Sequence, residues 1–162
     1  MSDTPATDSR LAALEARLAE LEDREAIRNL VARYGPLADA GEAAAVASLW
    51  AEDGVYDVGG FGASAGRVAI AALIAGPVHR QLMRDGCAHL LGPVHVHIDG
   101  ARAVAVGHSC VFRHTGKAFE AYRVAANRWE LLKRDGQWQV ARRSNRLLDG
   151  DAAARALLVP GA

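Results

Sequence analysis

The sequence predicts an α+β fold in which a curved, mostly antiparallel sheet wraps around N-terminal helices as a cone-shaped barrel. Apolar residues recur at helical spacing through the first third of the chain, whereas from His89 onward they alternate at the period of a strand. Helices followed by a run of strands are typical of α+β domains. A sheet curved around helices leaves an apolar interior that suits a small ligand.

The composition fits one globular domain. Apolar residues make up 51% of the 162 residues, enough for a sizeable core. Lys and Arg total 19, as do Asp and Glu, so no net charge favours nucleic acid or an anionic membrane as a partner. No apolar run is long enough to span a membrane, and the polar N-terminus is unlike a signal peptide. With only two cysteines, the expected location is the cytoplasm.

The expected helices lie mostly in the N-terminal part of the chain. A disordered tail over residues 1–9 precedes a single domain over 10–148, and a C-terminal tail over 149–162 is either a short helix or disordered. An apolar stripe predicts a first helix that lies on the domain or on a neighbouring subunit; its members are Leu11, Leu14, Leu18 and Leu21. Further helices are expected over 24–40, capped by Asp23 and kinked at Gly35-Pro36, and over 43–50 and 68–83.

The expected strands fill the rest of the domain. A turn over 51–54 leads to a strand over 55–61 and a mobile glycine-rich loop over 59–66. Four antiparallel strands follow after the helix, with glycine-containing turns between them. They cover residues 89–98, 103–114, 118–134 and 138–148.

Two polar residues stand where apolar ones would be expected. Asp39 closes the helix over 24–40, and His89 starts the first of the four strands. A carboxylate that holds an imidazole fixes its tautomer and makes it a better base. If the two meet in a pocket, the protein transfers protons. The alternatives are a solvated Asp39 and a hydrogen-bonded core histidine.

Strand parity places further polar groups on the sheet. Residues an even number of positions apart on a strand face the same side. His89, His95 and His97 are spaced in this way on one expected strand, as are His108, Cys110, Phe112 and His114 on the next. Asn127 and Trp129 share parity on the strand after that. Polar groups among apolar ones favour a ligand cavity over a dry core. Arg143 and Arg146 are expected to be surface charges.

The histidines also allow a metal interpretation. His95 and His97, at i and i+2 on a strand, could chelate an ion together with His108 on the paired strand. The glutamate that follows such a pair in cupin-type sites is missing here. We therefore predict no metal and no cofactor, and bound metal would be the mark of this alternative.

Several segments in order resemble SnoaL-like proteins of the nuclear transport factor 2-like superfamily. They are REAIRNLVARY, Asp39, SLWAEDGVY, the glycine-rich run up to Gly66-Arg67 with Ile70, His89 and KRDGQWQVARR. The resemblance covers roughly residues 10–148 and implies the cone-shaped α+β fold. The pattern is most similar to the lyase branch that contains scytalone dehydratase, hexachlorocyclohexane dehydrochlorinase and bile-acid 7α-dehydratase.

The resemblance also implies roles for individual residues. Asp39 and His89 fall on the aspartate and histidine that the lyase branch uses, and the spacing of Tyr34 to Asp39 is similar to that of the bile-acid enzyme. His114 and Asn127 fall on substrate-contacting positions of scytalone dehydratase. The expected catalytic residues are therefore Asp39, His89 and Tyr34. The expected substrate-binding residues are Tyr56, Phe112, His114, Asn127 and Trp129.

The function implied is a cofactor-independent lyase of the dehydratase type, acting on a small, cyclic, apolar substrate. Two alternatives stay open: a polyketide cyclase or isomerase, and a non-catalytic binding or assembly module of the same fold. A cavity filled by Trp129, Phe112 and Leu90 would favour the binding module. The family also implies a homo-oligomer, either a dimer or a trimer.

Overall fold

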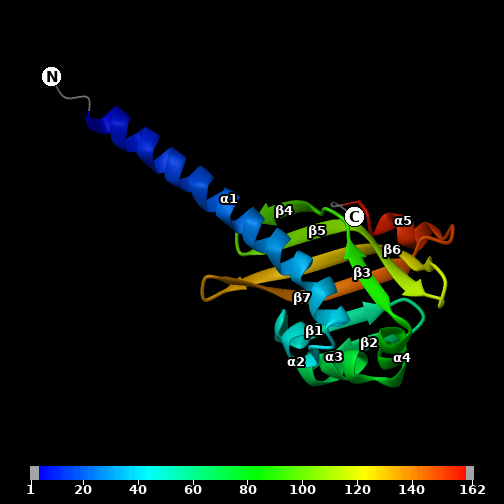
Figure 1. The fold of residues 1–162 in the computed structure, drawn as a ribbon. Helices are drawn as coiled ribbons and strands as arrows, with labels where there is room; N and C mark the ends of the chain where they lie inside the picture. The colour runs from blue at the N-terminus through cyan, green and yellow to red at the C-terminus, as the bar shows by residue number, and fades with distance from the viewer. Residues whose placement is uncertain (1–3, 160–162) are drawn as a thin grey trace.

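The computed structural model describes residues 4–159 as a curved seven-stranded sheet packed against helices (Figure 1). The elements in chain order are α1 (Thr4–Asp39), α2 (Ala43–Ser48), β1 (Trp50–Val58), β2 (Gly62–Ala65), α3 (Gly66–Ala75), α4 (Pro77–Asp85), β3 (Cys87–Leu91), β4 (His95–Asp99), β5 (Arg102–His114), β6 (Phe119–Arg134), β7 (Gln137–Leu147) and α5 (Ala152–Ala156). The predicted α+β class is confirmed.

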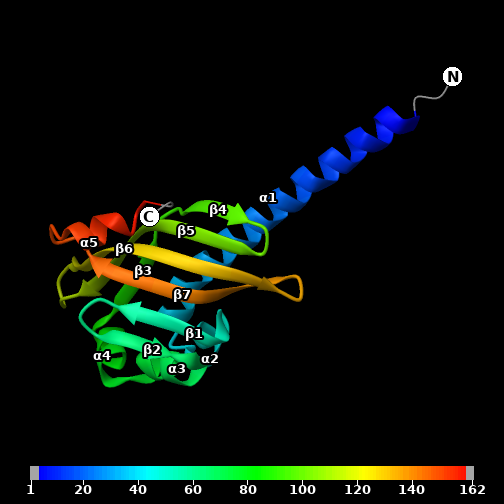
Figure 2. The ribbon, with the colours of Figure 1, turned by 180° about the vertical axis from the view of Figure 1, so that it is seen from behind.

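The sheet is curved but not closed. Its strands lie in the order β2, β1, β7, β6, β5, β3, and β4 also pairs with β5. Pairing is antiparallel except between β1 and β7, which are parallel. Seen from behind, β1, β7, β6 and β5 lie in front of α1, so the long helix packs on one face of the sheet (Figure 2). The core lies between that face and the helices.

Helix α1 is one continuous helix, where the sequence predicted two. It begins at Thr4, so the disordered tail expected over residues 1–9 is wrong for residues 4–9, while residues 1–3 lie outside the described residues. The helical pattern does not stop at Asp23. The Asp23 carboxylate instead accepts hydrogen bonds from Lys133 Nζ at 2.7 Å and Trp138 Nε1 at 2.9 Å, which tie the helix to the β6–β7 hairpin. As predicted, the helix continues through Pro36.

The two halves of α1 have different environments. The second half carries buried apolar side chains into the core, among them Ile27, Val31 and Tyr34. The first half extends past the sheet (Figure 1), and its leucines at 11, 14, 18 and 21 are exposed. The expected packing of this stripe on its own domain is therefore wrong.

Four local predictions also differ from the structure. Residues 51–54, expected to form a turn, belong to β1. Instead of a turn, the β1–β7 pairing has an irregularity between Trp50 and Val55. The glycine-rich loop contains β2, which forms a hairpin with β1. The helix expected over 68–83 breaks at Gly76-Pro77 into α3 and α4. The strand expected over 89–98 breaks at 92–94 into β3 and β4.

The break between β3 and β4 also ends the shared parity of three histidines. His89 lies on β3, while His95 and His97 lie on β4 with exposed side chains. The C-terminal tail forms the short helix α5, capped by the Asp151 side chain. No helix among the described residues is long and apolar enough to cross a membrane.

Candidate active site

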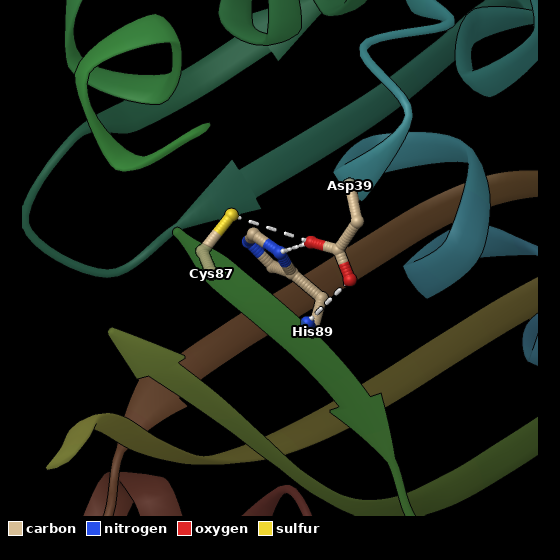
Figure 3. A group of neighbouring side chains, drawn as sticks. All are labelled: Asp39, Cys87 and His89. Carbon is tan, nitrogen blue, oxygen red and sulfur yellow. Dashed lines mark hydrogen bonds and ion pairs between the residues drawn. The ribbon is translucent and has the colours of Figure 1, made fainter. Parts of the chain in front are cut away.

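Asp39 and His89 meet as the sequence predicted. Asp39 is the last residue of α1, and His89 is the central residue of β3. Oδ1 of Asp39 lies 2.6 Å from His89 Nδ1, and Oδ2 accepts the backbone N–H of His89 at 2.8 Å (Figure 3). One carboxylate therefore fixes both the ring and the main chain of the histidine.

A glycine in α1 makes this contact possible. A Cβ atom added to Gly35 would lie 2.1 Å from the carbonyl oxygen of His89. Only a residue without a side chain lets the helix approach β3 so closely. Gly35 lies one helical turn before Asp39, so the close approach sets the distance across which Asp39 reaches His89.

The contact determines which ring nitrogen is basic. A carboxylate beside Nδ1 selects the tautomer with hydrogen on Nδ1, which leaves the lone pair on Nε2. Burial lowers the pKa of His89 below its ordinary value and outweighs the opposite effect of Asp39, while His79 and Arg143 lower it further. His89 is therefore a neutral base near pH 7.

His89 lines an open cavity of about 280 Å³ between α1, α3, α4 and the sheet. Most of its wall is apolar, including Val58, Leu73, Ile74, Leu91 and Val111. Polar side chains on the wall include Tyr34, Tyr56, His79, His89, Ser109, Arg143 and Asn145. Such a wall fits a small, largely apolar ligand that polar groups orient.

The two predicted tyrosines lie together on this wall. The hydroxyl oxygens of Tyr34 and Tyr56 are 3.3 Å apart, and both residues are buried. Burial raises the pKa of Tyr56 far above its ordinary value, so its hydroxyl stays protonated. The Tyr34 ring lies edge-on to the His89 ring, with 6.4 Å between centroids.

Asn127 and Trp129 lie beneath the cavity rather than on its wall. Both are buried and absent from the lining. Asn127 Oδ1 already accepts hydrogen bonds from Arg143 Nε at 3.0 Å, Arg143 Nη2 at 2.8 Å and Asn145 Nδ2 at 3.0 Å. Asn127 Nδ2 donates to Ser109 Oγ at 2.8 Å. The amide therefore positions Arg143, and its oxygen is not free to bind a substrate carbonyl.

Phe112 and His114 do not reach the cavity. His114 packs on Phe119 with ring centroids 5.0 Å apart, and neither Phe112 nor His114 is part of the cavity wall. Val111 pairs with His89 and lines the cavity with Ser109, so regular alternation along β5 turns Phe112 and His114 to the other face of the sheet. The sequence pattern groups residues by face but does not tell which face of the strand lines the cavity.

The sequence interpretation missed several residues of the wall, among them Arg143 and His79. Arg143, expected at the surface, is 2% exposed. Trp138 and Val140 face inward, and unbroken alternation would make Arg142 the next inward residue. The β6–β7 register shifts by one residue between Val140 and Arg142, so Arg143 faces inward instead. His79 is buried because the helix break at Gly76-Pro77 turns it inward, and its Nε2 lies 2.8 Å from the carbonyl oxygen of Ala38.

The histidines that suggested a metal are not grouped. Within residues 4–159, the only trio of potential ligand residues whose atoms lie within 4.8 Å of one another is Asp39, Cys87 and His89. Burial and the adjacent Asp39 raise the pKa of the Cys87 thiol to about 11, so it stays protonated and points its hydrogen at Asp39, 3.5 Å away. A protonated thiol is a poor metal ligand.

Comparison with known proteins gives the family. The family model described as SnoaL-like domain matches residues 19–144. The chain belongs to the SnoaL-like family. No curated protein matches the sequence significantly.

Solved structures share the NTF2-like fold of this SnoaL-like chain. An NTF2-like protein with a cystatin-like fold from Novosphingobium aromaticivorans is 57% identical, with a TM-score of 0.90 over 92% of this chain and 97% of the other. A Mycobacterium tuberculosis protein of unknown function is 24% identical, with a TM-score of 0.71 over 85% and 90%. A third protein, from Novosphingobium aromaticivorans and provisionally named a scytalone dehydratase, is 19% identical, with a TM-score of 0.67 over 80% and 86%.

Proposed function

We propose that this SnoaL-like protein is a cofactor-independent lyase of the dehydratase type. The observation that carries the proposal is the contact of Asp39 with His89 Nδ1 on the wall of an apolar cavity. This arrangement leaves Nε2 as a base beside a cavity whose wall is mostly apolar. The substrate class is a small cyclic compound with a hydroxyl group β to a carbonyl.

The proposed reaction is an elimination of water. His89 Nε2 takes a proton from the carbon next to the carbonyl, and the electrons of that C–H bond form the new double bond. The C–O bond at the β carbon breaks with its electron pair on oxygen, and the proton held by His89 joins this oxygen to give water. Asp39 stabilises the imidazolium between these steps, and the hydroxyl of Tyr34 donates a hydrogen bond to the departing oxygen.

The open cavity supports this proposal over the non-catalytic module. That alternative predicted a cavity filled by Trp129, Phe112 and Leu90. Trp129 and Phe112 lie off the wall, and Leu90 is 57% exposed at the rim, so none of them fills the space in front of His89.

The test is turnover of a bicyclic β-hydroxy ketone. 3-Hydroxy-1-tetralone loses water to give the fluorescent product 1-naphthol. We expect the purified protein to accelerate this reaction and His89→Gln to lower kcat by about 10²–10⁴-fold. His95→Gln, which changes an exposed histidine, is the control. Equal turnover by the wild type and His89→Gln would remove His89 from the mechanism.

A further inference from the structure

The cavity contains a buried positive charge without a counter-ion. Arg143 forms no ion pair with any carboxylate of the described residues. Asp39 is engaged by His89, and Asp57, on the neighbouring strand, is engaged by Arg142 and Arg146. Buried charges in proteins are normally paired, because burial without a partner costs free energy.

The surroundings of Arg143 leave one nitrogen of the guanidinium without a hydrogen bond to the described residues. Nε and Nη2 both donate to Asn127 Oδ1, and the carbon Cζ lies 4.1 Å from the ring centroids of Tyr34 and Trp129 and 4.7 Å from that of Tyr56. Nη1 is buried and has no hydrogen-bond partner among the described residues. Aromatic faces stabilise a cation but accept no strong hydrogen bond from it. Nη1 is therefore a buried, unpaired donor on a residue that lines the cavity.

We propose that the cavity binds ligands that carry a carboxylate, which accepts a hydrogen bond from Arg143 Nη1. This inference names the substrate class for the proposed function. Tyr34 contacts both Arg143 and His89, so a ligand held at one end by the guanidinium presents its ring to His89 Nε2. Leaving the Nη1 donor unpaired costs free energy even when no reaction takes place. A ligand with a permanent negative charge removes this cost on binding, whereas a charge that develops only during turnover does not.

The test compares two binding probes of the same shape. 2-Naphthoate carries a carboxylate, and 2-naphthamide is its neutral counterpart. Hydrogen bonds to charged groups predict that the wild type binds 2-naphthoate about ten- to hundredfold more tightly, measured by titration calorimetry. Arg143→Gln should lose this preference while its affinity for 2-naphthamide changes little. Arg142→Gln removes the same charge from the adjacent residue, which pairs with Asp57, and should keep the preference.

The outcomes separate this inference from the proposed function. Equal affinity of the wild type for the two probes, or no binding of 2-naphthoate at millimolar concentration, overturns the carboxylate site. A preference that survives in Arg143→Gln overturns it as well, and the wild-type comparison stands even if that variant fails to fold. His89→Gln should keep the preference, because binding does not need the base. Loss of turnover with intact binding therefore concerns His89 alone.

A second, independent observation concerns the exposed leucine stripe of α1. Leu11, Leu14, Leu18 and Leu21 are 54%, 51%, 56% and 64% exposed on the part of the helix that extends past the sheet (Figure 1). Their spacing places them at the a and d positions of two heptads. An apolar seam of this kind needs a partner helix.

The charges beside the seam identify the partner and its direction. Arg10 and Arg17 occupy g positions, and Glu15 and Glu22 occupy e positions. In a parallel pair of identical helices, each g residue faces the e residue five positions later in the partner, so Arg10 faces Glu15 and Arg17 faces Glu22. In an antiparallel pair, arginine would face arginine and glutamate would face glutamate. The next g residue, Arg24, bonds to Glu20 and to the carbonyl of Val96, where the helix meets the sheet.

We infer that the projecting part of α1 pairs in parallel with the same segment of a second copy of the chain. Two heptads bind weakly on their own, so the association should depend on protein concentration. Sedimentation of the wild type should show oligomers. Leu18→Glu should lower the association constant by at least about tenfold, because it places a charge in the apolar seam.

Cysteine crosslinking tests the direction. Parallel pairing brings residue 14 of the two copies together, so Leu14→Cys should form a crosslinked dimer under mild oxidation. Ala16→Cys, on the outer side of the same helix, is the matched control and should not exceed the wild-type background from Cys87 and Cys110. A monomer at all concentrations, or equal crosslinking of the two variants, overturns the inference.

Discussion

Asp39 has two effects on His89 that a neutral side chain cannot reproduce. Its Oδ1 fixes the ring tautomer, and its negative charge opposes the loss of basicity that burial causes. Asparagine has the same shape, but its amide group can donate to Nδ1 and select the opposite tautomer, which directs the N–H toward the substrate.

We therefore expect Asp39→Asn to lower kcat for 3-hydroxy-1-tetralone by about 10²–10⁴-fold. Circular dichroism and thermal unfolding check that the fold is retained. An Asp39→Asn protein that is folded and fully active would show that the carboxylate has no part in the reaction.

The pKa of His89 predicts the acid limit of activity. Burial lowers this pKa below 6.5, so the neutral base persists below that pH. The rate constant kcat/KM should stay level from neutral pH down past 6.5 and fall only at more acid pH, as Nε2 becomes protonated. A fall that begins above pH 6.5 would contradict the lowered pKa.

At the scale of single residues, the sequence predicted the pairing of Asp39 with His89 but not the buried Arg143 nearby. Asp39 and His89 stood out because each is polar at the end of an apolar run. Arg143 could not be placed, because a one-residue register shift in β7 decides whether Arg142 or Arg143 faces inward. Asn127 was found, but its hydrogen bonds to Arg143 give it a positioning role instead of the expected contact with substrate.

At the scale of elements, the contact between α1 and β3 depends on Gly35. A methyl group there would lie 2.1 Å from the backbone oxygen of His89, and backbone cannot rotate away as a side chain can. Helix and strand must then separate, which moves Asp39 relative to His89.

We expect Gly35→Ala to destabilise the protein by about 1–3 kcal/mol, as overpacking typically does, and to lower turnover. Chemical denaturation and the 1-naphthol assay measure the two effects. Gly92→Ala is the control, since its new Cβ would lie at an ordinary 3.4 Å from the nearest atom, the His108 backbone oxygen. A Gly35→Ala protein as stable and active as Gly92→Ala would mean that the close approach is not required.

Element types could be predicted from periodicity more reliably than element ends. The long strands of the C-terminal half and the helical character of residues 24–39 came from apolar spacing alone. The breaks at Gly76-Pro77 and at residues 92–94 did not, because glycine and proline can either kink an element or end it. Asp23 lies inside the continuous helix and not at a cap, and its carboxylate binds Lys133 and Trp138, which the sequence does not reveal.

At the scale of the whole molecule, two carboxylates join distant elements. Asp23 ties α1 to the β6–β7 hairpin, and Asp57 on β1 binds Arg146 and Arg142 of β7. Hydrogen bonds from Lys133 lower the pKa of Asp23, and those from Arg146 lower the pKa of Asp57, below 3.8 in each case. A carboxyl group whose pKa is lowered by folding stabilises the protein above its unfolded pKa, and this contribution disappears as pH falls through its folded pKa.

We therefore expect Asp57→Asn to reduce the free energy of unfolding at pH 7 and to have a smaller effect at pH 3, where part of the wild-type contribution is already lost. Denaturant titration at both pH values measures the difference. Asp99→Asn, at an exposed site on β4, should have little effect at either pH. An equal loss for Asp57→Asn at pH 7 and pH 3 would mean that the ion pairs do not provide the stability.

The most direct measurement is the protonation state of the two ring nitrogens of His89 by ¹⁵N NMR of the intact protein at pH 7. A carboxylate 2.6 Å from Nδ1 predicts hydrogen on Nδ1 and a bare Nε2. Hydrogen on Nε2, or a doubly protonated ring at this pH, would contradict the account of His89 as the base of the cavity.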